Sequence, residues 1–328
     1  MKRILPVIGI TSLMMSSQLY AQSELRKAGQ AYYEQLFAST VVLSDNDLIS
    51  LGIQSFDPSS VFHTDNDNFG NEDTVQNRKN IAVFTLPLHF NLSEPDSPFQ
   101  HNLQFRLGYL SISQDLQLAD DTPMDNFKQE VYSGFFNYLL KYRLTSNWAL
   151  GYGFGSYLMY ANNSYNFNSQ ESQILKPFLD DAITNSSAWS TIIEPQIELD
   201  YEQHQAWGKW GFSSQWHYFY GKNWGQANDG YLGNPEGWRI SNGVKFQYDL
   251  SHSFTYTPSL YSSIKRIDIG GDATQILETN SYYEASFGVL LSDLFGKDGW
   301  IETVGIGANI NYGSALRGGS IILYVNPF

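Results

Sequence analysis

The sequence contains no cysteine, which excludes disulfide bonds and thiol catalysis. Cationic residues are also scarce: the chain has 19 Lys and Arg against 33 Asp and Glu, which gives a formal net charge of -14. A chain this acidic is repelled by phosphate backbones and is a poor candidate for binding nucleic acid. Long hydrophobic runs are missing as well. No stretch after residue 21 approaches 18 uninterrupted apolar residues, so no transmembrane helix is expected there.

The N-terminal residues have the pattern of a secretory signal peptide. Lys2 and Arg3 form a short positive region, residues 4–15 are mainly apolar, and a polar, small-residue zone ends in Leu19-Tyr20-Ala21. We therefore expect residues 1–21 to be removed by cleavage near Ala21, although Leu19 is bulkier than the usual residue at its place. The alternative is an uncleaved anchor, for which the apolar run is short. Loss of the two cations changes the formal charge from -14 to -16.

The rest of the chain is dominated by alternation of large and small or polar residues. In residues 148–160 the large side chains are Trp148, Leu150, Tyr152, Phe154, Leu158 and Tyr160, and the small ones between them include Ala149, Gly151, Gly153 and Gly155. Such a strand has an apolar outer face and a bare inner face. Because the same pattern recurs almost to the C-terminus, the outer face is expected to contact lipid. Aromatic residues are 16% of the chain and gather near the segment ends, as in the aromatic girdles of membrane barrels.

Eleven segments with this alternation can be counted. They are residues 81–92, 99–112, 131–144, 148–160, 189–201, 207–220, 238–250, 253–266, 281–292, 300–312 and 318–328. A lipid-exposed sheet must close, and bacterial single-chain barrels have even strand numbers, so a twelfth strand is expected within residues 48–62, despite Pro58. Short turns at 145–147, 203–206 and 251–252 alternate with long polar loops at 63–80, 114–130, 162–188, 221–237 and 268–280. Residues 173–183 of the longest loop could form a short helix. The sequence thus predicts an all-β, 12-stranded antiparallel transmembrane β-barrel over residues 48–328 with its short turns toward the periplasm.

Residues 22–47 form a different segment, an N-terminal helix and linker. In residues 23–40, Leu25, Ala28, Tyr32 and Leu36 recur at helical spacing. Eighteen helical residues span about 27 Å, close to the height of the apolar band of a barrel. We therefore expect an α-helix inside the lumen as a plug; a periplasmic helix or an extended tether is the alternative.

Several inward residues could contact this helix. Gly151, Gly153 and Gly155 leave room for it, and Glu194, Glu198 and Asp200 could pair with Arg26 and Lys27. The glycines could instead serve strand curvature. The acidic residues could instead line a water-filled lumen, balanced by inward cations on other strands, namely Arg106, Lys141, Arg143, Arg239 and Lys245.

A helix followed by twelve strands resembles the translocator barrel of autotransporters. The C-terminal strand ends in Phe328 and carries Tyr324 and Ile322, similar to the signal that the barrel-assembly machinery reads, although Asn326, Ser320 and Pro327 depart from it. After cleavage only Gln22 would precede the helix, so a passenger is missing. The chain thus resembles the solitary autotransporter-like outer-membrane barrels. That resemblance implies a place in the outer membrane of a Gram-negative bacterium, with outer-membrane lipid and the assembly machinery as partners.

The expected function is that of a non-enzymatic barrel: a plugged or narrow pore, a translocator, or a surface structural protein, with no catalytic residue, cofactor or metal. One alternative is an outer-membrane enzyme. Ser241-Asn242-Gly243 partly matches the outer-membrane phospholipase, but Arg239 stands where that family has His, and a serine without a positioned base is a weak nucleophile. An omptin-like protease would depend on His63 with Asp65 and Asp67. Residues 65–72 resemble a calcium loop, in which Phe69 occupies a ligand position. Adhesion or phage-receptor activity through the long loops is a further alternative, with no surface ligand indicated.

Overall fold

The computed structural model describes residues 7–45, 49–51, 81–94, 97–116, 123–250, 256–292, 301–313 and 318–327. Helix α1 spans Val7–Ser44, and short helices α4 (Gln170–Leu179), η2 (Ala227–Gly230) and α5 (Ala273–Leu277) lie between strands. The strands are β1 (Ile49–Leu51), β2 (Ile81–Asn91), β3 (Phe99–Leu116), β4 (Asp125–Arg143), β5 (Trp148–Asn166), β6 (Ser187–Gln205), β7 (Gly208–Gly225), β8 (Glu236–Asp249), β9 (Thr257–Gly271), β10 (Ser281–Ser292), β11 (Thr303–Gly313) and β12 (Gly318–Val325). None of the described helices is long and apolar enough to cross a membrane.

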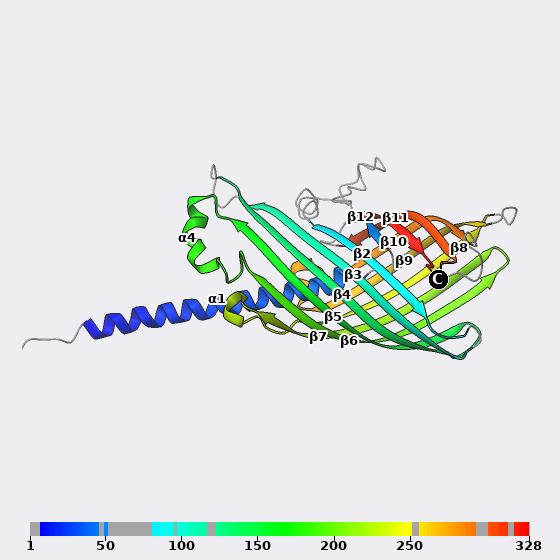
Figure 1. Cartoon of the computed structure of the whole chain (residues 1–328), viewed down its shortest axis with the longest axis horizontal. Helices are drawn as coiled ribbons and strands as arrows, with labels where there is room; N and C mark the ends of the chain where they lie inside the picture. Colours follow the sequence, from blue (N-terminus) through cyan, green and yellow to red (C-terminus); the bar gives the residue numbers. More distant parts are fainter. Residues whose placement is uncertain are drawn as a thin grey trace, which may run out of the picture.

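The strands form one antiparallel sheet in which each long strand pairs with its neighbours in sequence. The short strand β1 pairs with β12 at Ile49 and Leu323 and with β2 at Leu51 and Phe84, so the strand order returns to its start. Figure 1 shows the long, tilted strands curving around the end of α1. The predicted all-β antiparallel barrel with an N-terminal helix is therefore confirmed. Of the strand expected within residues 48–62 the structure describes only Ile49–Leu51, and loop 63–80 and turn 251–252 lie outside the described residues.

Alternation places large side chains outward and small or polar ones inward. Tyr152 and Phe154 on β5 are 56% and 55% exposed, whereas Gly151 and Gly155, which flank this pair, are buried. Because successive side chains point to opposite faces of a strand, each strand contributes its large apolar side chains to an exposed outer band and its small or polar ones to the lumen.

Several strands continue farther toward the long loops than the alternation predicts. The bounds expected for the loop over residues 114–130 are wrong: β3 runs to Leu116 and β4 begins at Asp125, with Asp115 paired to Asn126. Beyond the lipid both faces of a strand can be polar, so the ladder continues after the hydrophobic period has ended. The short helix expected at 173–183 is found as α4, three residues earlier, because Ser169 caps it by accepting from the Ser172 N–H at 3.1 Å.

Candidate functional site: a helix held in the barrel lumen

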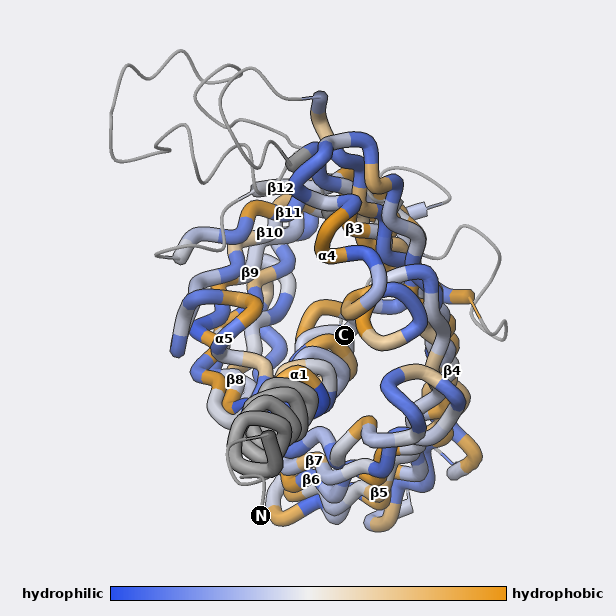
Figure 2. Tube along the Cα trace, turned by 90° about the vertical axis from the view of Figure 1, so that its left-hand side faces the viewer, coloured by the Kyte–Doolittle hydropathy of each residue, from blue (hydrophilic) through white to orange (hydrophobic). Residues whose placement is uncertain are grey.

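The C-terminal third of α1 lies inside the barrel. Tyr33, Leu36, Phe37 and Val41 are at most 1% exposed. They belong to one apolar cluster with inward side chains of β3 to β10, including Leu110, Val131, Met159, Ile192, Phe219 and Ile269. Viewed along the barrel, α1 enters the ring of strands and ends within it (Figure 2). The structure thus places the predicted helix in the lumen, although the helix itself extends beyond residues 23–40 at both ends.

Polar contacts fix the direction of the helix at the level where it enters the barrel. The Tyr32 hydroxyl donates to Gln129 of β4 at 2.5 Å, and the Tyr33 hydroxyl lies 2.7 Å from Ser186 Oγ, just before β6. On another side, Gln35 donates to Gln275 of α5 at 2.8 Å. Contacts from three different directions leave the helix little freedom to tilt.

The loop between β7 and β8, residues 226–235, docks on the same helix. Asn228 donates to the carbonyl of Arg26 at 2.8 Å, and its side chain lies against Gly29, where a Cβ would come within 2.7 Å of it. Arg26 forms an ion pair of 2.9 Å with Asp229, and Glu34 accepts from the Asn234 N–H at 2.9 Å. Asn228 and Asp229 both have positive φ, 50° and 54°, which Asn and Asp tolerate better than other residues. The conformation of this loop therefore places Asn228, Asp229 and the Asn234 N–H in contact with α1.

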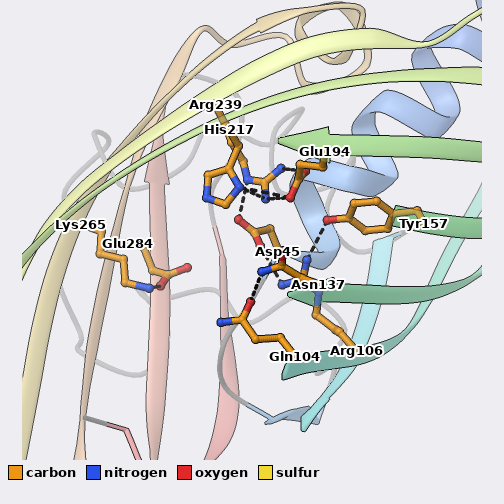
Figure 3. Close-up of polar contacts among 10 residues, drawn as sticks. All are labelled: Asp45, Gln104, Arg106, Asn137, Tyr157, Glu194, His217, Arg239, Lys265 and Glu284. Atoms are coloured by element: carbon orange, nitrogen blue, oxygen red, sulfur yellow. Dashed lines mark hydrogen bonds and ion pairs between the residues drawn. The ribbon is translucent and has the colours of Figure 1, made fainter. Parts of the chain in front are cut away.

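Asp45, immediately after α1, joins the helix to two strands deep in the lumen (Figure 3). Its Oδ1 accepts from Arg106 of β3 at 2.7 Å, and its Oδ2 accepts from Nε of Arg239 of β8 at 2.5 Å. The two strands are five steps apart in the sheet order. Arg106 also donates to the Tyr157 hydroxyl at 2.8 Å and lies 4.6 Å from the Phe135 ring centroid. One carboxylate thus connects the end of the helix to both sides of the barrel.

Arg239, which donates to Asp45, also donates to the buried carboxylate of Glu194. Arg239 donates to both oxygens of Glu194 on β6, at 2.6 and 2.9 Å, and His217 on β7 lies 3.1 Å from both Glu194 and Arg239. The side chains of Arg239 and Glu194 are 2% and 0% exposed. Bidentate Arg–carboxylate pairs are strong and directional, and losing one partner leaves a buried charge uncompensated. We call Asp45, Arg106, Glu194, His217 and Arg239 the lumen clasp.

A second charged group lines the barrel nearer the short turns. Lys141 of β4 forms ion pairs with Glu198 and, at 2.8 Å, with Asp200, both on β6. On another part of the wall Lys265 lies 3.5 Å from Glu284. The partners of Lys141 and Lys265 in these ion pairs are therefore carboxylates of the barrel wall.

The structure does not bring together the predicted partners of Arg26 and Lys27, so that expectation is wrong. Arg26 pairs with Asp229 and Lys27 with Glu24, whereas Glu194, Glu198 and Asp200 pair with cations of the barrel. The reason is distance along the helix, since 19 residues at 1.5 Å each separate Arg26 from Asp45 by about 28 Å. Sequence reasoning put Arg106 and Arg239 on the inner face but missed Asp45 and His217. An acidic residue directly after a helix aimed into a cationic wall was the available signal for Asp45.

The three glycines of β5 make room for neighbouring strands rather than for the helix. A Cβ at Gly151 would lie 2.6 Å from Glu198, one at Gly153 2.5 Å from Gln196, and one at Gly155 2.5 Å from Phe135. The expectation that they mark the helix-facing wall is therefore wrong, because large inward residues of β4 and β6 already fill that space.

The residues proposed for assembly or chemistry lie in separate parts of the chain. Ile322 and Tyr324 point into the barrel, each 0% exposed, and Phe328 lies outside the described residues. Ser241 lies on the inward face of β8, paired in register with Gln215. His63, Asp65, Asp67 and the calcium-like segment 65–72 lie outside the described residues. Within the described ranges, no group of three His, Asp or Glu is arranged to hold a metal ion.

Comparisons with known proteins give one family match. Residues 34–327 match the family model described as "Solitary outer membrane autotransporter beta-barrel domain". No curated protein matches at a significant level. Among solved structures, the translocator domain of the autotransporter NalP from Neisseria meningitidis is 10% identical, with 75% of this chain and 80% of that chain covered and a TM-score of 0.48. The β domain of the Bordetella autotransporter BrkA is 10% identical, with 75% and 88% covered and a TM-score of 0.44. LpxR from Salmonella typhimurium is 8% identical, with 77% and 89% covered and a TM-score of 0.35.

Proposed function

Because the chain belongs to the family of solitary outer membrane autotransporter β-barrel domains, we propose that it is a barrel of the Gram-negative outer membrane closed by its own N-terminal helix. In this proposal it acts as a surface structural protein, without catalysis and without a permanently open pore. The observation that carries the proposal is the lumen clasp, in which Asp45 at the end of α1 is held by Arg106 and Arg239 from strands five steps apart. A helix fixed at both the mouth and the middle of the lumen obstructs passage.

The proposal also includes an orientation. The connections that contain α4, η2 and α5 lie at the end of the barrel from which α1 emerges, and the short turns 144–147 and 206–207 lie at the other end (Figure 1). Long loops of outer-membrane barrels face the exterior. Cleavage near Ala21 would then leave the new N-terminus at the cell surface, beside the β7–β8 loop that holds Arg26.

Planar-bilayer conductance of the purified chain tests closure. We expect residues 22–328 to show little steady conductance and a variant lacking residues 22–40 to show a large one. The control is Lys27→Ala, which removes a contact within the helix and none with the barrel. Heat-modifiable electrophoretic mobility would establish that each variant is folded. A large conductance of the intact chain that the deletion leaves unchanged would refute the plug.

The absence of catalysis is tested separately. Ser241 faces the lumen, whereas lipid hydrolysis needs a nucleophile that the substrate can reach from the membrane. We expect no lipase activity from the detergent-solubilised chain. An activity abolished by Ser241→Ala would contradict the proposal and favour the enzymatic alternative.

A further inference from the structure

A row of aromatic residues crosses the outer surface of β3 to β7. Tyr109, Tyr132, Tyr160, Trp189 and Trp224 occupy successive paired positions on these five strands. The ring centroids of Tyr109 and Tyr132 are 5.1 Å apart, and those of Tyr160 and Trp189 are 4.8 Å apart. Trp189 and Trp224 are stacked, with centroids 5.3 Å apart and planes 10° from parallel. Such rows lie at the boundary between hydrocarbon and headgroups.

Lys222 lies on the same outer face of β7, two residues before Trp224. Its register partner on β6 is Thr191, which accepts from the Trp224 indole N–H at 3.4 Å. On the same face but farther from the β7–β8 loop, Tyr220 and its register partner Ile193 are 43% and 44% exposed. The lysine therefore stands where an apolar surface meets the stacked indoles, and its side chain is exposed.

Other cations on the outer face are neutralised by adjacent carboxylates. Lys128 pairs with Glu130 at 2.8 Å, and Arg266 pairs with Asp268 at 2.7 Å. Among the residues that the structure describes, no carboxylate forms an ion pair with Lys222. A lysine at the edge of the hydrocarbon is costly unless its ammonium group reaches water or an anion.

We propose that Lys222, Trp189 and Trp224 form a binding site for the phosphorylated sugar headgroup of an outer-leaflet glycolipid of the lipid A type. The ammonium group of Lys222 binds a phosphate, the indole faces contact the sugar ring, and the apolar surface around Ile193 receives the acyl chains. The charge of the lysine and the aromatic platform together match a headgroup that carries both a phosphate and a sugar. The proposal rests on the orientation proposed above, in which this rim faces the outer leaflet, but not on whether the lumen is closed.

The test measures binding of diphosphoryl lipid A to the full chain in neutral detergent by native mass spectrometry. Lys222→Gln is expected to weaken binding about fivefold, the effect of one cation at an anionic surface. Trp224→Leu is also expected to weaken it. The matched control Lys128→Gln makes the same change in net charge on β4, outside the proposed site on β6 and β7, and is expected to change binding little. Dephosphorylated lipid A should bind wild type and Lys222→Gln equally, and inorganic phosphate at the same concentration should not compete.

Three outcomes would overturn the proposal: unchanged binding by Lys222→Gln, an equal loss by Lys128→Gln, or equal binding of phosphorylated and dephosphorylated lipid by wild type. The second would indicate general charge attraction by the barrel surface. Lys222→Arg should retain binding, which separates loss of the charge from misfolding. Bilayer conductance of the same preparations keeps this test apart from the plug, because altered lipid binding with unaltered conductance concerns the lipid site alone.

Discussion

At the scale of single residues, Asp45 has the largest predicted effect on stability. Its carboxylate is the shared acceptor of Arg106 and Arg239, and both guanidinium groups lie on nearly unexposed side chains, 6% and 2%. Burying three charges together costs desolvation energy that only good geometry and complete pairing offset. Removing the carboxylate therefore lowers the free energy of unfolding by more than the loss of two hydrogen bonds alone would.

Asp45→Ala is expected to destabilise the folded chain by about 3–5 kcal/mol, because it leaves buried arginines without their common partner. Chemical unfolding in detergent micelles, followed by tryptophan fluorescence, measures the change. Lys27→Ala, which removes an exposed pair within α1, is expected to cost at most about 1 kcal/mol. Equal effects of the two substitutions would show that the lumen clasp contributes no more than a surface ion pair.

At the scale of secondary-structure elements, the sequence predicted the features that periodicity determines. The eleven long strands and the lumen helix were found because one face of each differs in polarity from the other. Their ends were found less well: β3 and β4 continue into the expected loop at 114–130, where both faces are polar. Pairings across the lumen, such as Asp45 with Arg239, depend on the depth at which the helix ends. Periodicity gives the face of a residue but not that depth, so Arg26 was assigned the wrong partners.

The helix α4 shows how a loop element can be fixed by one residue. Asp125 at the start of β4 accepts from the backbone N–H groups of Asn168 and Ser169 at 2.6 and 2.9 Å and from the Ser172 hydroxyl at 2.9 Å. The N-terminus of α4 is thereby tied to the barrel rim. The helix can then hold Ile174 and Phe178 exposed without collapsing onto the barrel.

Asp125→Ala is expected to loosen α4 while leaving the barrel intact. The buried donors of Ser169 and Ser172 would lose their acceptor, at a local cost of about 1–3 kcal/mol. Hydrogen exchange should increase across residues 167–186 and remain unchanged in β4 and β5 beyond the rim. The control is Asp180→Ala, which removes an exposed contact to Asn185 at the other end of α4. If Asp125→Ala instead increases hydrogen exchange in the barrel strands as much as in residues 167–186, Asp125 stabilises the barrel itself.

At the scale of the whole molecule, α1 is held by polar contacts on both sides of the apolar cluster that contains Tyr33, Leu36 and Phe37. The β7–β8 loop binds α1 at Arg26, where the helix enters the barrel, and the lumen clasp binds Asp45 at the end of the helix. A helix with two attachments remains in place when one is weakened, provided that the other persists. This separation allows the two attachments to be tested independently, and the absence of native cysteine allows the mouth contact to be made covalent.

Gly29→Cys with Asn228→Cys introduces the only two thiols in the chain, at positions where a Cβ on residue 29 would lie 2.7 Å from the Asn228 side chain. That proximity is compatible with a disulfide. Asn228→Cys also removes the hydrogen bond to the Arg26 carbonyl, so an Asp45→Ala background weakens both attachments while the thiols are reduced. We then expect conductance in the reduced state, a fall when the thiols are oxidised, and a return on adding a reductant. Asn228→Cys alone, with Asp45→Ala, is the control and should not respond to oxidation. If the oxidised and reduced double-cysteine chains conduct equally although the disulfide forms, movement of α1 does not open the barrel. The lumen clasp would then stabilise the fold without closing a passage.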